Sequence, residues 1–348
     1  MCTGHRRLRF SQLFLASAIA ALGIQHACPA SAQTYDPALV ARAKAEKRLV
    51  FYTGFSGNQL YNAIKKGYEE AFGIPVDMLI ARSSEVHERL RTEVMTGRTV
   101  ADALIHGEST SKRLAADGLL QKVDGIMGAA QLAVAPSAPG YSLPAYMSGY
   151  SLMVNTSLVK PQDEPKSWRD LLDPRWSGRL LGDDPRANGA GHVLFSVIVE
   201  KFGADFPRAI ATQKVVFGRD LGVDQMRIAR GEFALRFPQS LANMRDLKGL
   251  PVKFIIPAEG LVYVRADIGI ASGAPRPNAA KLFIEYMLSP STQGLLANNG
   301  LIPVIKNAPD AADPETRELV NRAKANLMGT SSAETQDAML ALAREVYR

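Results

Sequence analysis

The chain has 348 residues, 47% of them hydrophobic, which is enough to bury more than one core. Its formal charge is +7, and three arginines in the first 32 residues account for much of that excess. Without them, 38 basic side chains face 34 acidic ones, and no basic run is interleaved with aromatics. This pattern argues against a nucleic-acid-binding surface. Both cysteines, Cys2 and Cys28, also lie in these first residues, so the rest of the chain must be stabilised by core burial.

Residues 1–32 are predicted to be a cleavable export signal. Three arginines precede an apolar stretch at 13–24, and the small residues 30–32 form a cleavage site. The apolar stretch is shorter than the about 20 residues of a membrane-spanning helix. We therefore expect a mature periplasmic protein that starts near Gln33. Lipidation at Cys28 is an alternative, although its context is poor.

From residue 36 to about 116, short apolar runs alternate with amphipathic stretches. Strands are predicted at 48–53, 74–80 and 103–105, and helices at 36–47, 58–72, 85–96 and from about 109. This βαβαβα order favours a parallel sheet with helices on both faces. Ligands of such sheets bind beyond the carboxyl ends of the strands, near helix N-termini.

Residues 124–145 are rich in Gly, Ala, Pro and Ser, and we interpret them as a connecting segment that leads to a hinge. A strand at 151–155 and a short helix at 167–172 follow. A second α/β unit then runs to about residue 257, with strands near 179–182, 215–217, 233–236 and 252–256. Residues 263–270 are predicted to return as a strand, and 314–348 to form two helices.

Residues 273–304 predict two helices joined at a proline. Asn278 is the expected N-cap of the first, which has one apolar face. Ser289 is the expected N-cap of the second, with Pro290 at its first position. Asn299-Gly300 provides a left-handed stop.

This segment has the sequence PNAAKLFIEYMLSPSTQ and leads to a Gly-x-x-Pro-Val turn. It resembles the late segment of bacterial extracellular solute-binding proteins, the periplasmic receptors of ABC importers. Further landmarks follow in the family's order: LVFYTGFS, YEEAFGIPVDM, RLRTEVMTGRTVADAL, AADGLLQKV, YSLMVNTSLV with PKSWRDLLDPRWSGRL, and DDPRANGAGHVLFS. The resemblance implies an α/β, two-lobed (type II) periplasmic-binding-protein fold, in which each lobe is a doubly wound, mostly parallel sheet with flanking helices. Lobe 1 would comprise 33–140 and about 260–305, and lobe 2 about 141–259 and about 306–348, with the ligand cleft between them.

The same resemblance implies a function. The protein would capture a small solute by hinge closure and deliver it to an ABC permease and its ATPase, as a monomer without cofactor or enzymatic activity. One branch of the family binds ferric ion through adjacent tyrosines in the second lobe. Here the corresponding stretch, RGEFALRFPQSLANM, offers Phe237-Pro238, and neither can supply a phenolate oxygen to Fe³⁺.

Candidate binding residues in the first half follow the predicted strands. Hydroxyls and glycine N–H groups at helix starts suit carboxylate or phosphate oxygens, and an arginine there could clamp an anion. Ordinary turns and helix caps are the competing interpretation. The candidates are Thr53, Gly54, Arg82, Ser83, Ser84, Glu108 and Ser109.

The second group of candidates combines a hinge strand with later loops. Alternating Tyr146, Ser148 and Tyr150 would share one side of an extended chain, either lining the cleft or packing in the core. A Gly-rich loop could direct N–H groups at an anion, or simply form a turn. The candidates are Tyr146, Ser148, Asp184, Arg186, Asn188, Gly189, Arg236, Gln239 and Glu259.

We expect the solute to be an organic anion, such as a phosphonate, sugar phosphate or carboxylate, because Ser/Thr/Gly loops and three arginines (Arg82, Arg186 and Arg236) lie at predicted helix starts and strand ends. A metal-ion receptor using Glu108, Glu259 and Asp184 is one alternative. A periplasmic enzyme on a bilobal fold is another, although no HExxH or GxSxG motif is present. A sensor subunit that presents its solute to a signalling receptor is a third.

Overall fold

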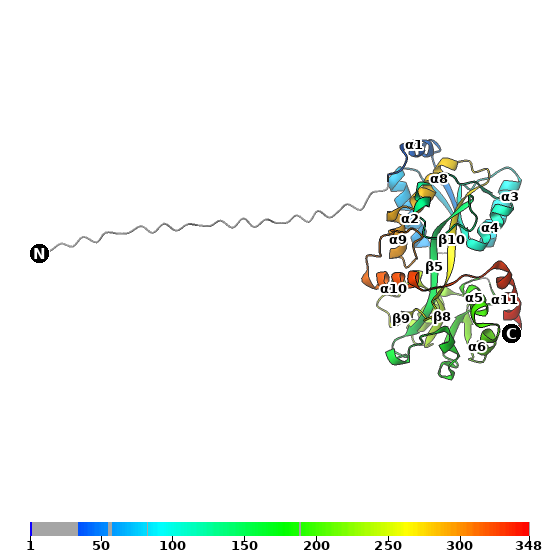
Figure 1. Ribbon diagram of the computed structural model, residues 1–348, viewed down its shortest axis with the longest axis vertical. Coiled ribbons are helices and arrows are strands. Elements are labelled where there is room, and N and C mark those ends of the chain that lie inside the picture. The colour runs from blue at the N-terminus through cyan, green and yellow to red at the C-terminus, as the bar shows by residue number, and fades with distance from the viewer. Residues whose placement is uncertain (2–33, 55–57, 82, 188, 348) are drawn as a thin grey trace. The chain divides into compact units, whose positions relative to one another are not determined.

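A computed structural model describes residues 1, 34–54, 58–81, 83–187 and 189–347 (Figure 1). The chain divides into residues 1–34 and a compact unit of residues 35–348, and the latter is the subject below. Apart from Met1, the predicted export signal lies outside the described residues. Within the described part of the chain, no helix combines the length and apolar character needed to cross a membrane.

The first part of the compact unit confirms the predicted alternation of helices and strands. Its elements are α1 (Pro37–Ala45), β1 (Leu49–Thr53), α2 (Asn58–Phe72), β2 (Val76–Ile80), α3 (Ser83–Met95), β3 (Ala103–Gly107), α4 (Glu108–Ala116) and β4 (Leu120–Gln121). The predicted start of α1 is also confirmed, because Asp36 accepts a hydrogen bond from the Ala38 N–H and Pro37 is the first helical residue.

The second part also keeps the predicted order of elements, with one long strand in place of a short one. Its strands are β5 (Ser142–Asn155), β6 (Leu180–Asp183), β7 (Val216–Gly218), β8 (Leu235–Ser240), β9 (Val252–Ile255), β10 (Leu261–Ala271) and β11 (Leu327–Gly329). Its helices are α5 (Ala190–Phe202), α6 (Asp205–Ala211), α7 (Leu221–Ala229), α8 (Pro277–Met287), α9 (Pro290–Asn298), α10 (Pro314–Ala325) and α11 (Ala333–Val346). Short 3₁₀ turns span Met127–Gln131, Pro161–Asp163, Trp168–Leu172, Pro174–Trp176, Leu241–Asn243 and Arg245–Leu247.

The strands form one sheet in the order β2-β1-β3-β10-β5-β8-β6-β7. Pairing is parallel within β2-β1-β3 and within β8-β6-β7, whereas β3-β10, β10-β5 and β5-β8 are antiparallel. The long strands β5 and β10 thus connect two parallel groups (Figure 1). The predicted strand at 151–155 is too short, because residues 142–150 pair with β10 and extend the same strand.

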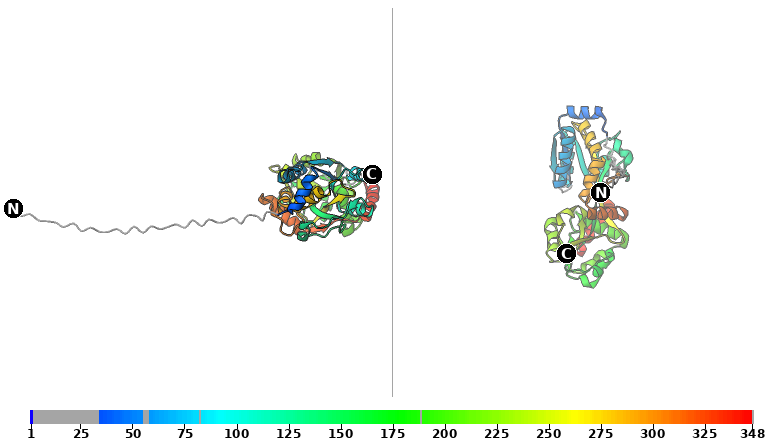
Figure 2. Two further views of the ribbon diagram at one scale, coloured as in Figure 1. Left: turned by 90° about the horizontal axis from the view of Figure 1, so that it is seen from above. Right: turned by 90° about the vertical axis from the view of Figure 1, so that its left-hand side faces the viewer.

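Each parallel group has its own core. Phe51 of β1, Tyr68 of α2 and Phe283 of α8 pack together in the first, and Phe195 of α5 packs on Phe237 of β8 in the second. The blue α1 lies at one end of this unit with the gold α8 next to it, and the green segments occupy the other half (Figure 2). The C-terminal helices divide between the cores, because α10 contributes to the first and α11 to the second.

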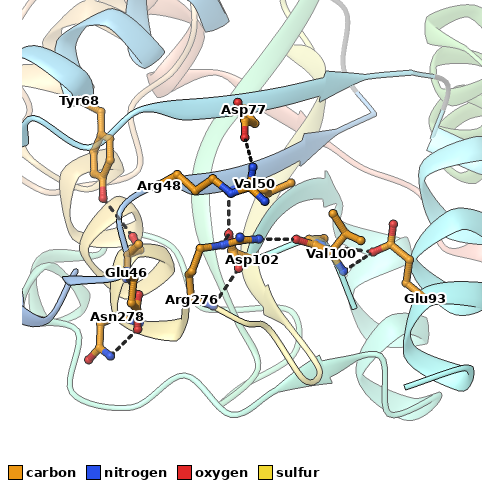
Figure 3. A network of polar contacts seen from close by, with 12 residues as sticks. Glu46, Arg48, Val50, Tyr68, Asp77, Glu93, Val100, Asp102, Arg276 and Asn278 are labelled. Atoms are coloured by element: carbon orange, nitrogen blue, oxygen red, sulfur yellow. Dashed lines mark hydrogen bonds and ion pairs between the residues drawn. The ribbon is translucent and has the colours of Figure 1, made fainter. Parts of the chain in front are cut away.

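The predicted N-cap of α8 is wrong. The helix begins at Pro277, and Asn278 lies in its first turn. Glu46, which follows α1, accepts hydrogen bonds from the N–H groups of Asn278 (3.2 Å) and Ala279 (2.7 Å) (Figure 3). A distant carboxylate therefore replaces a local cap, since helix N-termini favour negative charge. The caps predicted for α9 are confirmed: Ser289 accepts from the Thr292 N–H, and Gly300 has φ +72°.

Two buried carboxylates join the first parallel group to its helices. Asp102 accepts hydrogen bonds from the Val50 N–H (2.6 Å) and from Nε of Arg276 (2.7 Å), so it links β1 to the start of α8 (Figure 3). Glu93 of α3 accepts from the Val100 N–H (2.9 Å) and the Tyr52 hydroxyl (2.8 Å). Burial opposes ionisation of Glu93, but these hydrogen bonds hold its pKa below the ordinary value.

We predict that Glu93→Gln lowers the free energy of unfolding at pH 7 by about 2 kcal/mol, because hydrogen bonds to a charged acceptor are lost. The pKa of Glu93 is lower in the folded state, so its contribution is complete above the ordinary value of 4.5 and is lost as the pH falls through the folded-state pKa. Urea denaturation at several pH values should show the gap to wild type shrinking below pH 4.5.

Glu88→Gln, at an exposed position of the same helix, is the control and should change stability by less than about 0.5 kcal/mol. A gap between wild type and Glu93→Gln that stays constant with pH would contradict the assignment.

Candidate functional site

The candidates that follow β1 and β2 lie against each other. The hydroxyl of Ser83, the first residue of α3, donates to the carbonyl oxygen of Gly54 (3.2 Å). A Cβ on Gly54 would lie 2.4 Å from Oγ and 2.8 Å from Cα of Ser83, so only glycine permits this approach. Thr53 is buried at the end of β1, whereas Ser84 is exposed. Arg82 lies outside the described residues.

A small cavity lies beside this contact. It is lined by Gly54, Ser83, His87, His106 and Thr110, among others, and its volume of about 10 Å³ matches one water molecule. His106 is 4% exposed, and neither of its ring nitrogens has a hydrogen-bond partner among the described residues. Burial lowers the pKa of His106 to about 4, so its ring is neutral at physiological pH.

Glu108 and Ser109 begin α4 beside the strand β10. Oε1 of Glu108 lies 3.5 Å from a guanidinium nitrogen of Arg265, which also donates to Asp267 (2.8 Å). Ser109 is exposed on the first turn. Gly107 is the N-cap residue and provides no side-chain hydrogen bond, so the first amides of α4 have no cap from that residue.

Tyrosines and a serine of β5 form a polar strip between the two parallel groups. The hydroxyl oxygens of Tyr146 and of Tyr61 on α2 are 2.5 Å apart, and Tyr61 also hydrogen-bonds Thr53. Ser148 hydrogen-bonds the hydroxyl of Tyr150. Burial raises the pKa of all three tyrosines, that of Tyr61 to about 12, so their hydroxyls remain protonated.

Asp183 is the last residue of β6. Oδ2 of Asp183 accepts a hydrogen bond from the Gly191 N–H in the first turn of α5 (2.6 Å). A Cβ on Gly191 would lie 2.2 Å from the Asp183 carbonyl oxygen. The sequence analysis named the adjacent Asp184 as a candidate instead.

The predicted contacts Asp184 and Arg186 bind each other. Nε of Arg186 donates to Oδ1 of Asp184 (2.8 Å), and Arg219 reaches Oδ2 of Asp184 at the same distance. Although burial opposes ionisation, these hydrogen bonds lower the pKa of Asp184 to about 2. Gly189 is exposed nearby, and Asn188 lies outside the described residues.

The remaining candidates also contact their own chain. Arg236 is 1% exposed and donates to the carbonyl oxygen of Pro238 (2.5 Å) and to Oε1 of Gln239 (3.1 Å). Glu259 accepts from the hydroxyl of Ser167 (2.5 Å) at the start of the turn Trp168–Leu172. The structure therefore brings Thr53, Gly54 and Ser83 together at the ends of β1 and β2. It also places Tyr146 and Ser148 on the same strand, whereas Glu259 lies with neither group.

Comparison with known proteins gives the family. The sequence profile described as "Bacterial extracellular solute-binding protein" matches residues 99–328, more than half of the chain. The chain belongs to the bacterial extracellular solute-binding proteins. It is 25% identical over 247 residues to the "Putative 2-aminoethylphosphonate-binding periplasmic protein" of Salmonella typhimurium, which covers 68% of this chain and 71% of the relative.

Solved structures confirm the two-lobed periplasmic-binding-protein fold. The substrate binding protein of an ABC transporter from Agrobacterium tumefaciens has a TM-score of 0.72 at 17% identity, and covers 87% of this chain and 94% of its own. Iron-bound HitA from Pseudomonas aeruginosa has a TM-score of 0.68 at 21% identity, and covers 86% and 99%. The protein is thus a solute-binding protein whose fold is that of the substrate binding protein of an ABC transporter. Its Phe237 packs in the second core, where the iron-binding branch would need a phenolate.

We predict that Gly191→Ala destabilises the protein by about 1–3 kcal/mol, because the new methyl would overlap the backbone oxygen of Asp183. Gly189→Ala is the matched control. The φ of Gly189 is extended (173°), and its Cβ would lie 3.4 Å from Asp183 Oδ2, an ordinary contact. Chemical denaturation of both variants measures the difference. Equal stability of the two would contradict the close approach of α5 to β6.

Proposed function

We propose that this solute-binding protein captures a small organic anion in the periplasm, after removal of residues 1–32, and delivers it to an ABC permease and ATPase. The observation that carries the proposal is the polar strip of β5, which joins the carboxyl ends of both parallel groups. Carboxyl ends of strands are where ligands of such sheets bind. A solute on this strip would contact both groups at once.

The proposed lobes follow the sheet. Lobe 1 would comprise residues 33–140 and about 260–305 together with α10, which packs in the first core. Lobe 2 would comprise residues about 141–259 together with α11, which packs in the second core, and β5 and β10 would form the hinge. Closure requires only that the solute binds the closed state more tightly than the open one. We propose that the protein acts as a monomer and that capture involves no chemical reaction.

The anionic group is best accommodated by the first lobe. Hydroxyls of Thr53 and Ser83 gather at the ends of β1 and the start of α3, and the start of α4 has no side-chain cap. In the second lobe, Arg186 and Arg236 donate to groups of their own chain, as the Ser83 hydroxyl does in the first. The start of α4 without a side-chain cap is therefore the feature that favours the first lobe. The phosphonate named for the relative from Salmonella typhimurium belongs to the same chemical class.

A metal-ion solute has weaker support. The three carboxylates considered for it have separate partners: Arg265 for Glu108, Ser167 for Glu259, and Arg186 with Arg219 for Asp184. Within the described ranges, no group of three or more His, Cys, Asp or Glu side chains is arranged to hold a metal ion. Hard cations prefer several converging oxygen ligands.

The test is a thermal-unfolding screen of the mature protein with phosphonates, sugar phosphates, carboxylates and ferric salts. A solute at 100 times its Kd should stabilise the folded state by about 2.7 kcal/mol. We expect at least one organic anion to raise the Tm in a concentration-dependent way. Stabilisation by ferric ion alone would contradict the proposal and favour a metal receptor.

A further inference from the structure

We infer that Arg186 is a positioning residue: it ties the loop after β6, residues 184–187, to Tyr347 at the end of α11, instead of contacting the solute. The inference rests on the proposed function, which places the solute at the carboxyl ends of strands such as β6. It adds a determinant of the site that lies outside those strand ends, because α11 then sets the conformation of a loop in the second lobe.

Tyr347 is a fixed point in the second core. It follows α11, which packs beside α5 (Figure 1). Its ring meets the rings of Phe217 of β7 and Phe195 of α5 edge-on, with centroids 4.9 and 5.8 Å away. Its hydroxyl donates to the carbonyl oxygen of Pro207 in α6 (2.7 Å). Three elements therefore hold this residue, and its backbone carbonyl has a defined position.

The guanidinium group of Arg186 joins this carbonyl to the loop. Its Nη1 donates to the carbonyl oxygen of Tyr347 (2.6 Å). Its Nε and Nη2 donate to Oδ1 (2.8 Å) and Oδ2 (3.0 Å) of Asp184. Because the guanidinium is planar and its donors point in fixed directions, one side chain sets the separation between the loop and α11.

Asp184 holds the loop together from within. Its Oδ1 also accepts from the N–H of Arg186 (2.9 Å), and its carbonyl oxygen accepts from the N–H of Ala187 (3.3 Å). Its own N–H donates to the carbonyl oxygen of Gly218 at the end of β7 (3.1 Å), and Nε of Arg219 donates to its Oδ2 (2.8 Å). The loop is thus attached to β7 through Asp184 and to α11 through Arg186.

The loop in turn lies next to groups at the end of β6 and the start of α5. Asp183 directly precedes it, and Oδ2 of Asp183 accepts from the Gly191 N–H in the first turn of α5 (2.6 Å). A change in the conformation of residues 184–187 would therefore move polar groups at a strand end where ligands of such sheets bind.

Burial distinguishes this tie from another arginine contact of α11. Asp184 is 3% exposed, so water does not readily replace the donors that it loses. Arg208 contacts Glu345 of α11 at 2.8 Å, but both side chains are half-exposed. Exposed ion pairs contribute little because water solvates both partners. Arg208 is therefore the matched control for Arg186.

The test is hydrogen–deuterium exchange of the mature chain without solute, followed in peptides that cover residues 184–193. In Arg186→Gln we expect exchange in this segment to be about 10-fold faster, as for the loss of charge-assisted hydrogen bonds, with no change in β1 to α3. Arg208→Gln should change it by less than about twofold.

A second change isolates the contact with Tyr347. In a chain that ends at Tyr347, the carbonyl becomes a terminal carboxylate, which accepts more strongly from a guanidinium. We expect exchange in 184–193 to be about threefold slower in this shortened chain when Arg186 is present, and unchanged by the shortening when Arg186→Gln is present. A loss of general stability would not produce such a coupling.

The outcomes separate this inference from the proposed function, because no solute is used. An equal effect of the shortening with and without Arg186, or faster exchange throughout the second half in Arg186→Gln, would overturn the positioning role. So would an equal acceleration in Arg208→Gln. If thermal unfolding shows that Arg186→Gln does not fold, the shortened chain with Arg186 decides: slower exchange supports the role, and unchanged exchange overturns it. Failure of every organic anion to bind would instead overturn the proposed function.

Discussion

The antiparallel pairing of β5 with β10 is the constraint on which this molecule depends. These two long strands are the only described path in the sheet from the β2-β1-β3 group to the β8-β6-β7 group. Each group buries its own core, and Leu241 and Met244, which follow β8, pack in the first core. Because β5 pairs with β8 and its Tyr146 contacts Tyr61 of α2, a solute that hydrogen-bonds the tyrosines of β5 is positioned to reach the loops of both groups.

Polar groups at the two ends of β5 differ in character. Toward β1, Thr53, Tyr61 and Tyr146 form a chain of neutral hydroxyls. Toward β6, Tyr150 is buried, and the nearby charges of Asp184 and Arg186 are paired with each other.

Much of the fold could be predicted from the sequence, because short periodic segments such as 49–53 and 58–72 carry their own signals of strand and helix. The N-cap of α8 could not, since its acceptor Glu46 is 232 residues away in sequence. The candidate site shows the same division. The alternation of Tyr146 and Ser148 can be seen in the sequence itself. The pairing of Arg186 with Asp184 and the burial of Arg236 depend on tertiary packing.

The central claim is that the solute lies along β5 and contacts both parallel groups. The most direct measurement is a crystal structure of the protein with the solute that remains bound through purification. The account predicts solute atoms within hydrogen-bonding distance of Tyr150 or Asp183 at one end, and of the loops after β1 and β3 at the other. A solute bound away from β5, or held by one group alone, would contradict it.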